Sequence, residues 1–314
     1  MKKSKESYVK LVKMEASNID VLLPEVKFFI DKIENNQSFH FLRFNHGIID
    51  LYCERYVMCD TKVLPFENFE KNLIEGNYKL LSQDLYHSTY FNTSHNNSVL
   101  TKKYFNSLLR LFHGYKGISD KLHISLSLGN GLGTIWGRWP EWNELQAARL
   151  RIVSFICNIS KYKYYHSGVL KHFCLMDDHY KLFKSLNDNG FRVIVVGPEY
   201  MRLFKVKYDI NDFLHIPITR IGAIDMMKDV INQINENKTE KTIIINSTGH
   251  IITAHLSETF LNTNVFLLDI GRSFDYDFKE LIGIEKTLDK NGWHAPNQFD
   301  EKELIEHIKQ LRNG

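Results

Sequence analysis

Continuous apolar runs separated by amphipathic segments dominate the second half of the chain. FRVIVVG (191–197), KTIIINST (241–248) and VFLLDIG (265–271) carry β-branched residues or leucine at successive positions, not at alternate ones. A strand with this pattern is covered on both faces, as strands of parallel sheets are. LHIPIT (214–219) is a shorter strand of the same region. The pattern therefore predicts several buried, parallel strands.

Segments with helical spacing of apolar residues alternate with these strands. In the first such segment Val21, Leu22, Val26, Phe29 and Ile33 recur near the 3.6-residue period. The predicted helices cover 20–36, 66–81, 101–113, 141–159, 222–236 and 249–262, and two further strands cover 39–44 and 122–129.

Alternating strands and helices form right-handed βαβ units in a doubly wound sheet. We therefore predict an α/β, Rossmann-like fold with a mostly parallel sheet and helices on both faces. The chain reads as a single domain over 1–314, with a mixed helical insertion around 60–120 and a C-terminal helical tail around 298–314.

Composition narrows the function only slightly. The chain has 314 residues and a formal net charge of +3, which is too small to indicate nucleic-acid binding by itself. The sequence contains no run of about 18 apolar residues, so it predicts no transmembrane helix. The basic N-terminus lacks the apolar segment of a secretory signal. We expect a cytoplasmic protein.

The cysteines indicate a reducing environment. They form no C-x-x-C pair, so we expect free thiols and neither a disulfide framework nor a zinc site. The four cysteines are Cys53, Cys59, Cys157 and Cys174.

Ligands of doubly wound sheets bind at the carboxyl ends of the strands. The search for a site therefore starts at the residues that follow Phe44, Leu128, Val196, Asn246 and Asp269.

Arg43 lies within the first of these strands. An arginine inside a buried strand needs an anionic partner. One interpretation is a structural salt bridge to Asp50 or Asp269. The other is a guanidinium directed at a phosphate or a sugar acid, which its planar fork suits. Asn45, His46 and Gly47 follow it directly.

The strand at 122–129 ends in the glycine-rich stretch GNGLG (129–133). Such a loop lets backbone amides approach a phosphate or a ribose, and it is similar to the loops of methyltransferases. No acidic residue follows at the end of a next strand, so a structural turn packed beside Trp136, Trp139 and Trp142 is equally compatible with the sequence.

Three more loops follow strands. Gly197 and Pro198 precede Glu199, which would cap a helix or face a ligand. Ser247 or Thr248 can cap the next helix, whose N-terminal amides form a potential diphosphate cradle. The residues expected at these loops include Gly249, His250, Asp269, Arg272, Asp275 and Asp277.

The order of these motifs resembles that of glycosyltransferases with the GT-D fold, a group first known as a bacterial domain of unknown function. The stretches that carry the resemblance are RFNHGI (43–48), YHS (165–167), VIVVGPE (193–199), NSTGHIITAHL (246–256) and DIGRSFD (269–275). The resemblance covers roughly residues 39–278. It implies a nucleotide-sugar donor and a hydroxyl acceptor such as a glycan, a lipid-linked sugar or a modified nucleic-acid base.

The chain departs from this family where the family has metal-binding carboxylates. In that family's D-G-E motif the two carboxylate positions correspond to His46 and Ile48 here. The family also has a histidine directly after D-I-G, and this chain has Arg272 at that position. Isoleucine cannot ligate a metal, and one histidine is a poor ligand set for Mg²⁺ or Mn²⁺. The expectation is therefore an enzyme with no metal and no cofactor, in which cationic side chains stabilise the leaving diphosphate.

The site expected from the sequence combines both arguments. The candidate general bases, in order, are His46, Asp50 and Glu199. The candidate donor-binding residues are Arg43, Asn45, Gly47, Gly197, Thr248, Gly249, His250, Asp269, Arg272 and Asp275. Two alternatives stay open: a methyltransferase or other nucleotide-cofactor enzyme that uses the GNGLG loop, and an inactive glycan- or nucleic-acid-binding protein of the same fold.

Overall fold

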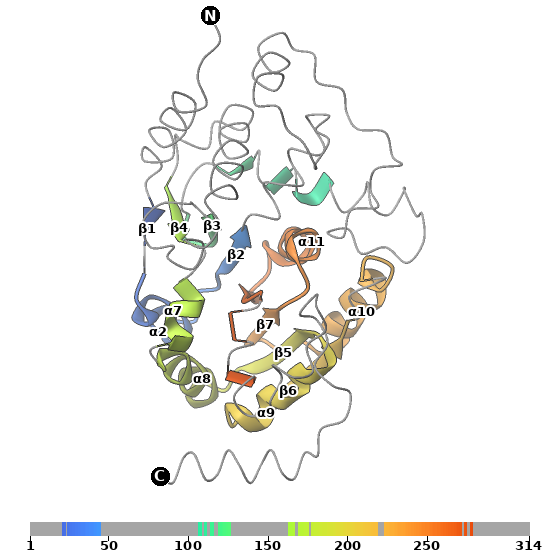
Figure 1. The fold of residues 1–314 in the computed structure, drawn as a ribbon. Helices are drawn as coiled ribbons and strands as arrows, with labels where there is room; N and C mark the ends of the chain where they lie inside the picture. The colour runs from blue at the N-terminus through green and yellow to red at the C-terminus, as the bar shows by residue number, and fades with distance from the viewer. Residues whose placement is uncertain are drawn as a thin grey trace, which may run out of the picture.

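The computed structural model describes residues 21–22, 24–44, 106–108, 110–111, 114–115, 119–126, 163–166, 169–175, 177–218, 223–271, 273–274 and 277–278. Its centre is an eight-stranded sheet in which the paired strands run parallel (Figure 1). The strands are β1 (Val21–Leu22), β2 (His40–Phe44), β3 (Leu122–Leu126), β4 (Tyr164–His166), β5 (Arg192–Gly197), β6 (Asp212–Pro217), β7 (Thr242–Asn246) and β8 (Phe266–Asp269).

The strand order is β1-β4-β3-β2-β8-β7-β5-β6. The first four strands of the sequence form one half of the sheet and the last four form the other. The two halves meet where β2 pairs with β8. All carboxyl ends point to the same edge because the strands are parallel. The predicted fold class is confirmed.

Helices cover both faces of the sheet. They are α2 (Val26–Glu34), α7 (Val169–Leu175), α8 (Asp178–Asp188), the 3₁₀ helix η3 (Glu199–Leu203), α9 (Phe204–Lys207), α10 (Met227–Asn237) and α11 (His250–Phe260). Residues of α10 and α11, together with Leu108, Leu111 and Tyr115, belong to one core cluster, and residues of α2, α7, α8, η3 and α9 belong to the other.

The central strands contribute to both clusters. Ile194 and Val196 pack into the first, whereas Val193 and Val195 pack into the second, and all four are 0% exposed. Successive residues of a strand point to opposite faces, so a strand between two helical layers must be apolar at every position. This is the physical origin of the continuous apolar runs. Burial of each such side chain stabilises the fold by about 1.5–3 kcal/mol.

The first predicted helix is shorter than expected. The pattern predicted a helix over 20–36, but Val21–Leu22 is a strand and the helix begins at Val26. Pro24 explains the difference, because proline disfavours the helical conformation in the residue before it. The apolar residues at 21 and 22 therefore belong to the edge of the sheet.

The sequence analysis did not identify β4, α7 or α8. β4 has three residues between polar neighbours, so it has no apolar run to reveal it. Helix α8 did carry a signal, because its buried Leu182, Phe183 and Leu186 follow helical spacing. The predicted helix at 141–159, the GNGLG loop, most of the insertion around 60–120 and the tail at 298–314 lie outside the described residues. Within the described residues no helix is long and apolar enough to cross a membrane.

Two buried histidines on neighbouring strands allow a matched test of polar burial. His123 of β3 is 1% exposed and packs edge-on against Phe28 and Phe39. Neither ring nitrogen has a partner within hydrogen-bond geometry, although the backbone of Asp120 lies near enough to act on the pKa of the ring. Burial and the nearby Lys32 lower the pKa of His123 to about 4, so the ring is neutral at pH 7. We expect His123→Phe to raise the free energy of unfolding by about 1–2 kcal/mol, because it removes two unpaired polar atoms. Urea unfolding at pH 7 measures this change.

His40 provides the control. It is 0% exposed, and its ring nitrogens lie 2.9 Å from Ser257 Oγ and 3.1 Å from the carbonyl oxygen of Val265. His40→Phe leaves both partners unpaired in the core and should lower the free energy of unfolding by about 2 kcal/mol or more. Equal losses from both substitutions would contradict the interpretation of His123.

Candidate active site

The carboxyl ends of four adjacent strands bring together most of the described candidate residues. Asn246 of β7 pairs with Asp269 of β8 on one side and with Val196 of β5 on the other. β2 joins the group through its pairing with β8. Arg43, Gly197, Thr248, Gly249 and Asp269 therefore lie at one edge of the sheet, as the parallel arrangement predicted.

Beyond the end of the β2–β8 ladder, hydrogen bonds of side chains connect the two strands at this edge. The ladder pairs only His40 with Leu267 and Phe41 with Leu268. Beyond it, Asp269 Oδ2 accepts a hydrogen bond from the backbone amide of Arg43 at 3.2 Å. The guanidinium Nη1 of Arg43 donates in turn to the carbonyl oxygen of Ile270 at 3.2 Å. These contacts connect the two halves of the sheet next to the candidate site.

Asp269 is the centre of this network and is 2% exposed. Its Oδ1 accepts from the amide of Gly271 at 3.0 Å, and its Oδ2 lies 3.0 Å from the hydroxyl of Thr253 in α11. Burial raises the pKa of Asp269 from 3.8 to about 6, and the Arg43 guanidinium and the hydrogen bonds offset only part of that rise. The carboxylate therefore positions its neighbours instead of facing solvent.

Arg43 lies next to Asp269, one of its two predicted partners, and its role toward a phosphate stays a prediction. It is half-buried, its charge acts on Asp269, and its guanidinium lies along the backbone of the loop after β8. A methyl group at Gly271, which has φ +48°, would lie 2.5 Å from Arg43 Nη1. Glycine at 271 thus gives the guanidinium its place. Asp50, the other predicted partner of Arg43, lies outside the described residues.

The loop before α11 differs from the prediction in its capping. Ser247 or Thr248 was expected to cap the helix, but the N-cap is Gly249, with φ +105° and no side-chain cap hydrogen bond. Thr248 donates to Asn246 Oδ1 at 2.7 Å, and Ser247 donates to the carbonyl oxygen of Gly271 at 2.5 Å. Ser247 thus joins this loop to the loop after β8, Thr248 bonds back to the end of β7, and the capping prediction is wrong.

A second polar chain fixes the start of α11 against the sheet. Asn246 Nδ2 donates to Thr253 Oγ1 at 2.6 Å, and that hydroxyl also lies 2.9 Å from the carbonyl oxygen of Gly249. Thr253 is 0% exposed and had no distinguishing feature in the sequence, because it occupies an ordinary position on an apolar helix. The sequence analysis therefore missed the residue that connects α11 to Asp269.

The loop after β5 is tightly packed at Gly197 and exposed at Glu199. A methyl group at Gly197 would collide with Met201 Sδ, so a larger residue there would force the Met201 side chain to move. His215 Nε2 lies 3.3 Å and 3.2 Å from the carbonyl oxygens of Gly197 and Pro198. Glu199 begins η3 and is 53% exposed, with Arg202 Nη1 at 3.9 Å. Glu199 is therefore accessible to a substrate.

The remaining candidates are only partly covered by the structure. His250 is the first residue of α11, and its side chain lies outside the description. The candidates that lie outside the described residues altogether are Asn45, His46, Gly47, Asp50, Arg272 and Asp275.

A separate polar cluster was not found from the sequence. Cys174, His179 and Asp277 offer metal-ligand atoms within 4.8 Å of one another among the described residues. Asp277 was expected as an acid beyond β8, and Cys174 as a free thiol. Cys174 and His179 are five positions apart in the sequence, but Asp277 lies 98 positions beyond His179, and only the fold brings it to them.

The fold belongs to the class of open, doubly wound, parallel α/β structures with a polar edge at the carboxyl ends of the strands. Within this class the chain is similar to a solved selenomethionine-substituted structure of domain of unknown function 1792, with a TM-score of 0.54 and 14% identity over 95% of this chain and 97% of that chain. It is also similar to a structure described as a new glycosyltransferase (DUF1792) from Streptococcus sanguinis, with a TM-score of 0.50 and 14% identity over 89% of this chain and 96% of that chain. No protein-family model and no curated protein sequence matches the chain. The likeness confirms the fold that the motif order implied.

The raised pKa of Asp269 predicts an unusual pH dependence of stability. Between about pH 4 and pH 6 the folded protein holds a proton on Asp269 that the unfolded chain has released. The contribution of Asp269 to stability is therefore present below about pH 4 and is lost as the pH rises through about 6. We expect the free energy of unfolding of the wild type, relative to Asp269→Asn, to fall by about 2–3 kcal/mol across this interval.

Urea unfolding of both proteins at a series of pH values measures the difference. Other titrating groups cancel because both proteins contain them. A difference that stays constant from pH 4 to pH 7 would show that Asp269 is ionised in the folded protein throughout.

Proposed function

We propose that the protein is a glycosyltransferase that moves a sugar from a nucleotide-sugar donor to a hydroxyl group of a glycan, a lipid-linked sugar or a modified nucleic-acid base. The observation that carries the proposal is the convergence of Arg43 and the N-terminus of α11 at one edge of a parallel sheet. The likeness of the fold to a structure described as a glycosyltransferase supports it.

The donor diphosphate would lie across the carboxyl ends of β2, β8 and β7. Gly249 presents no side chain at the start of α11, where backbone amides and the helix dipole favour an anion. Arg43 would approach the diphosphate from the opposite half of the sheet. We assign further contacts to Arg272 and His250 on the basis of their positions in the chain.

The acceptor hydroxyl needs a base to remove its proton as the new bond forms. His46 is the first candidate because the ordinary pKa of histidine lies near neutrality, and Asp50 and Glu199 follow. Glu199 satisfies the requirement of access, because 53% of its side chain is exposed at the sheet edge. The leaving diphosphate would be stabilised by cationic groups and helix amides without a divalent ion.

A metal-independent transfer follows from His46 and Ile48 at the positions where the resembling family has carboxylates. In a buffer free of Mg²⁺ and Mn²⁺, initial rates of sugar transfer should be unchanged when either ion is added as the only variable. A rate that depends on Mn²⁺ would overturn this part of the proposal and would point to Asp275 or Asp277 as a ligand.

Arg43→Lys tests the role of the guanidinium. The substitution keeps the charge but loses the planar fork, so donor binding should weaken, and turnover efficiency should fall by roughly 30- to 1000-fold, which corresponds to about 2–4 kcal/mol. If Arg43 has only a structural role, the melting temperature should fall while donor affinity stays normal. Calorimetric titration and thermal unfolding of the same sample separate the two results.

Gly271→Ala displaces the guanidinium without changing its chemistry, and Gly190→Ala is the matched control. Both glycines have positive φ, +48° and +69°, so both alanines strain the backbone by about 1–2 kcal/mol. Only the methyl group at 271 meets Arg43, whereas nothing lies within 4 Å of one at 190. Donor affinity should therefore fall in Gly271→Ala and stay normal in Gly190→Ala.

A thermal-shift screen identifies the ligand class. Nucleotides and nucleotide sugars should raise the melting temperature. A rise with S-adenosylmethionine instead would overturn the proposal in favour of a methyltransferase. Acceptor binding without donor hydrolysis or transfer, with any sugar nucleotide, would identify an inactive binding protein.

A further inference from the structure

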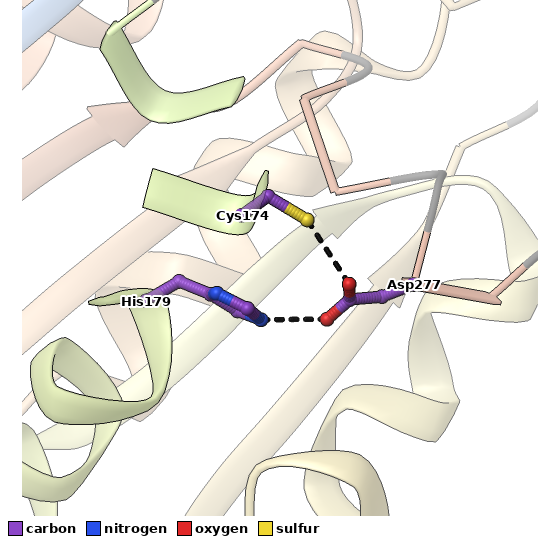
Figure 2. A group of neighbouring side chains, drawn as sticks. All are labelled: Cys174, His179 and Asp277. Carbon is purple, nitrogen blue, oxygen red and sulfur yellow. Dashed lines mark hydrogen bonds and ion pairs between the residues drawn. The ribbon is translucent and has the colours of Figure 1, made fainter. Parts of the chain in front are cut away.

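Three side chains of metal-ligand type meet outside the network around Asp269. Cys174 lies on α7, His179 on α8, and Asp277 in the chain that follows β8. Figure 2 shows the thiol and the imidazole directed at different oxygens of the same carboxylate. Cys174 Sγ lies 3.0 Å from Asp277 Oδ1, and His179 Nε2 lies 2.6 Å from Asp277 Oδ2. Cys174 is 4% exposed and His179 is 0% exposed, so the cluster is screened from bulk water.

The second ring nitrogen of His179 also has an oxygen neighbour. His179 Nδ1 lies 3.2 Å from the carbonyl oxygen of Phe173, which can only accept a hydrogen bond. His179 Nε2 lies 2.6 Å from a carboxylate oxygen of Asp277. Two lone pairs at that distance repel each other, so a proton or a metal ion must lie between His179 and Asp277.

The set of donor atoms fits a borderline divalent ion. A thiolate, an imidazole and a carboxylate are the ligands that Zn²⁺ takes, at about 2.3, 2.0 and 2.1 Å. A tetrahedral ion with these bond lengths separates neighbouring ligand atoms by about 3.5 Å. The two observed contacts would need to open by less than about 1 Å to reach it. The bond from His179 Nδ1 to a backbone carbonyl is the outer contact that orients metal-ligating histidines.

We propose that Cys174, His179 and Asp277 form a binding site for a transition-metal dication of the Zn²⁺ type, with a water molecule as the fourth ligand. Binding displaces the thiol proton of Cys174 and the proton between His179 and Asp277, and both pass to the buffer. Tyr208, whose hydroxyl lies 3.1 Å from Asp277 Oδ2, continues to donate to that carboxylate. The ion joins α7, α8 and the chain after β8, and it takes no part in the proposed sugar transfer.

Lys207 opposes the ion and so provides a test. Its ammonium lies 3.8 Å from Asp277 Oδ2, with the side chain 8% exposed, and 5.8 Å from the centre of the Tyr180 ring. The ammonium stabilises the carboxylate of the metal-free cluster but repels a dication at the same place. Lys207→Met should therefore tighten metal binding by about tenfold or more. If the cluster were only a hydrogen-bond network, the same substitution would destabilise the protein and added metal would restore nothing.

The experiment uses the full chain, freed of metal by a chelator and moved into chelator-free buffer. Titration with Co²⁺ should produce the near-ultraviolet absorption of a thiolate–cobalt bond, and Zn²⁺ should remove it. Zn²⁺ at a hundredfold excess over its dissociation constant should raise the melting temperature by about 4 °C, and Mg²⁺ should not. Cys174→Ser should lose the cobalt absorption, whereas Cys157→Ser should keep it.

Two results would overturn the proposal: no cobalt absorption in the wild type, or an absorption that persists in Cys174→Ser. Because the wild-type titration needs no variant, a misfolded substitution cannot hide a negative result. The measurements are spectroscopic and thermal and need no sugar donor. Failure of the metal site therefore leaves the proposed transferase activity untouched, and failure of that activity leaves the metal site untouched.

Discussion

The seam between the two halves of the sheet is the constraint on which the candidate site depends. The described ladder between β2 and β8 pairs two residues of each strand, whereas that between β2 and β3 pairs five. A short ladder holds the halves together weakly at their carboxyl ends. Asp269 continues the connection, because its carboxylate accepts from the Arg43 amide and lies within hydrogen-bond distance of Thr253. Burying a carboxylate costs free energy, but an apolar residue could not accept hydrogen bonds from β2, from the loop after β8 and from α11.

The sequence predicted the fold well where burial dictates residue type on both faces of a strand. Val193 to Val196 and Ile243 to Ile245 can only be central strands of a parallel sheet, and their alternation with helices fixes the class. It predicted poorly where three residues suffice for pairing, as in β4, and where one proline outweighs an apolar period, as at Pro24. Pairing with neighbouring strands determines the conformation of β4, and the steric effect of proline on the residue before it determines where the helix after Pro24 begins.

The site was predictable to the level of the sheet edge but not of individual contacts. Parallel strands bring Arg43, Gly249 and Asp269 to one edge whatever their side chains do. Which groups form hydrogen bonds with each other depends on loop geometry, and the pattern of residues in the sequence does not reveal that geometry. Ser247 appeared to be a helix cap but holds the loop after β8, and Thr253 carried no signal although it bonds within the network. The partnership of His179 with Asp277 spans 98 positions of the chain.

The chain after β8 links the two polar clusters. Close to its start, Gly271 donates to Asp269, accepts from Ser247 and lies under the guanidinium of Arg43. Six residues later, the carboxylate of Asp277 lies within hydrogen-bond distance of His179, Cys174 and Tyr208. Between them Phe274 is 0% exposed and belongs to the core cluster that also contains residues of α8 and α9. This stretch therefore supplies one residue to each cluster: Gly271 lies beside the Arg43 guanidinium, and Asp277 lies beside Cys174 and His179.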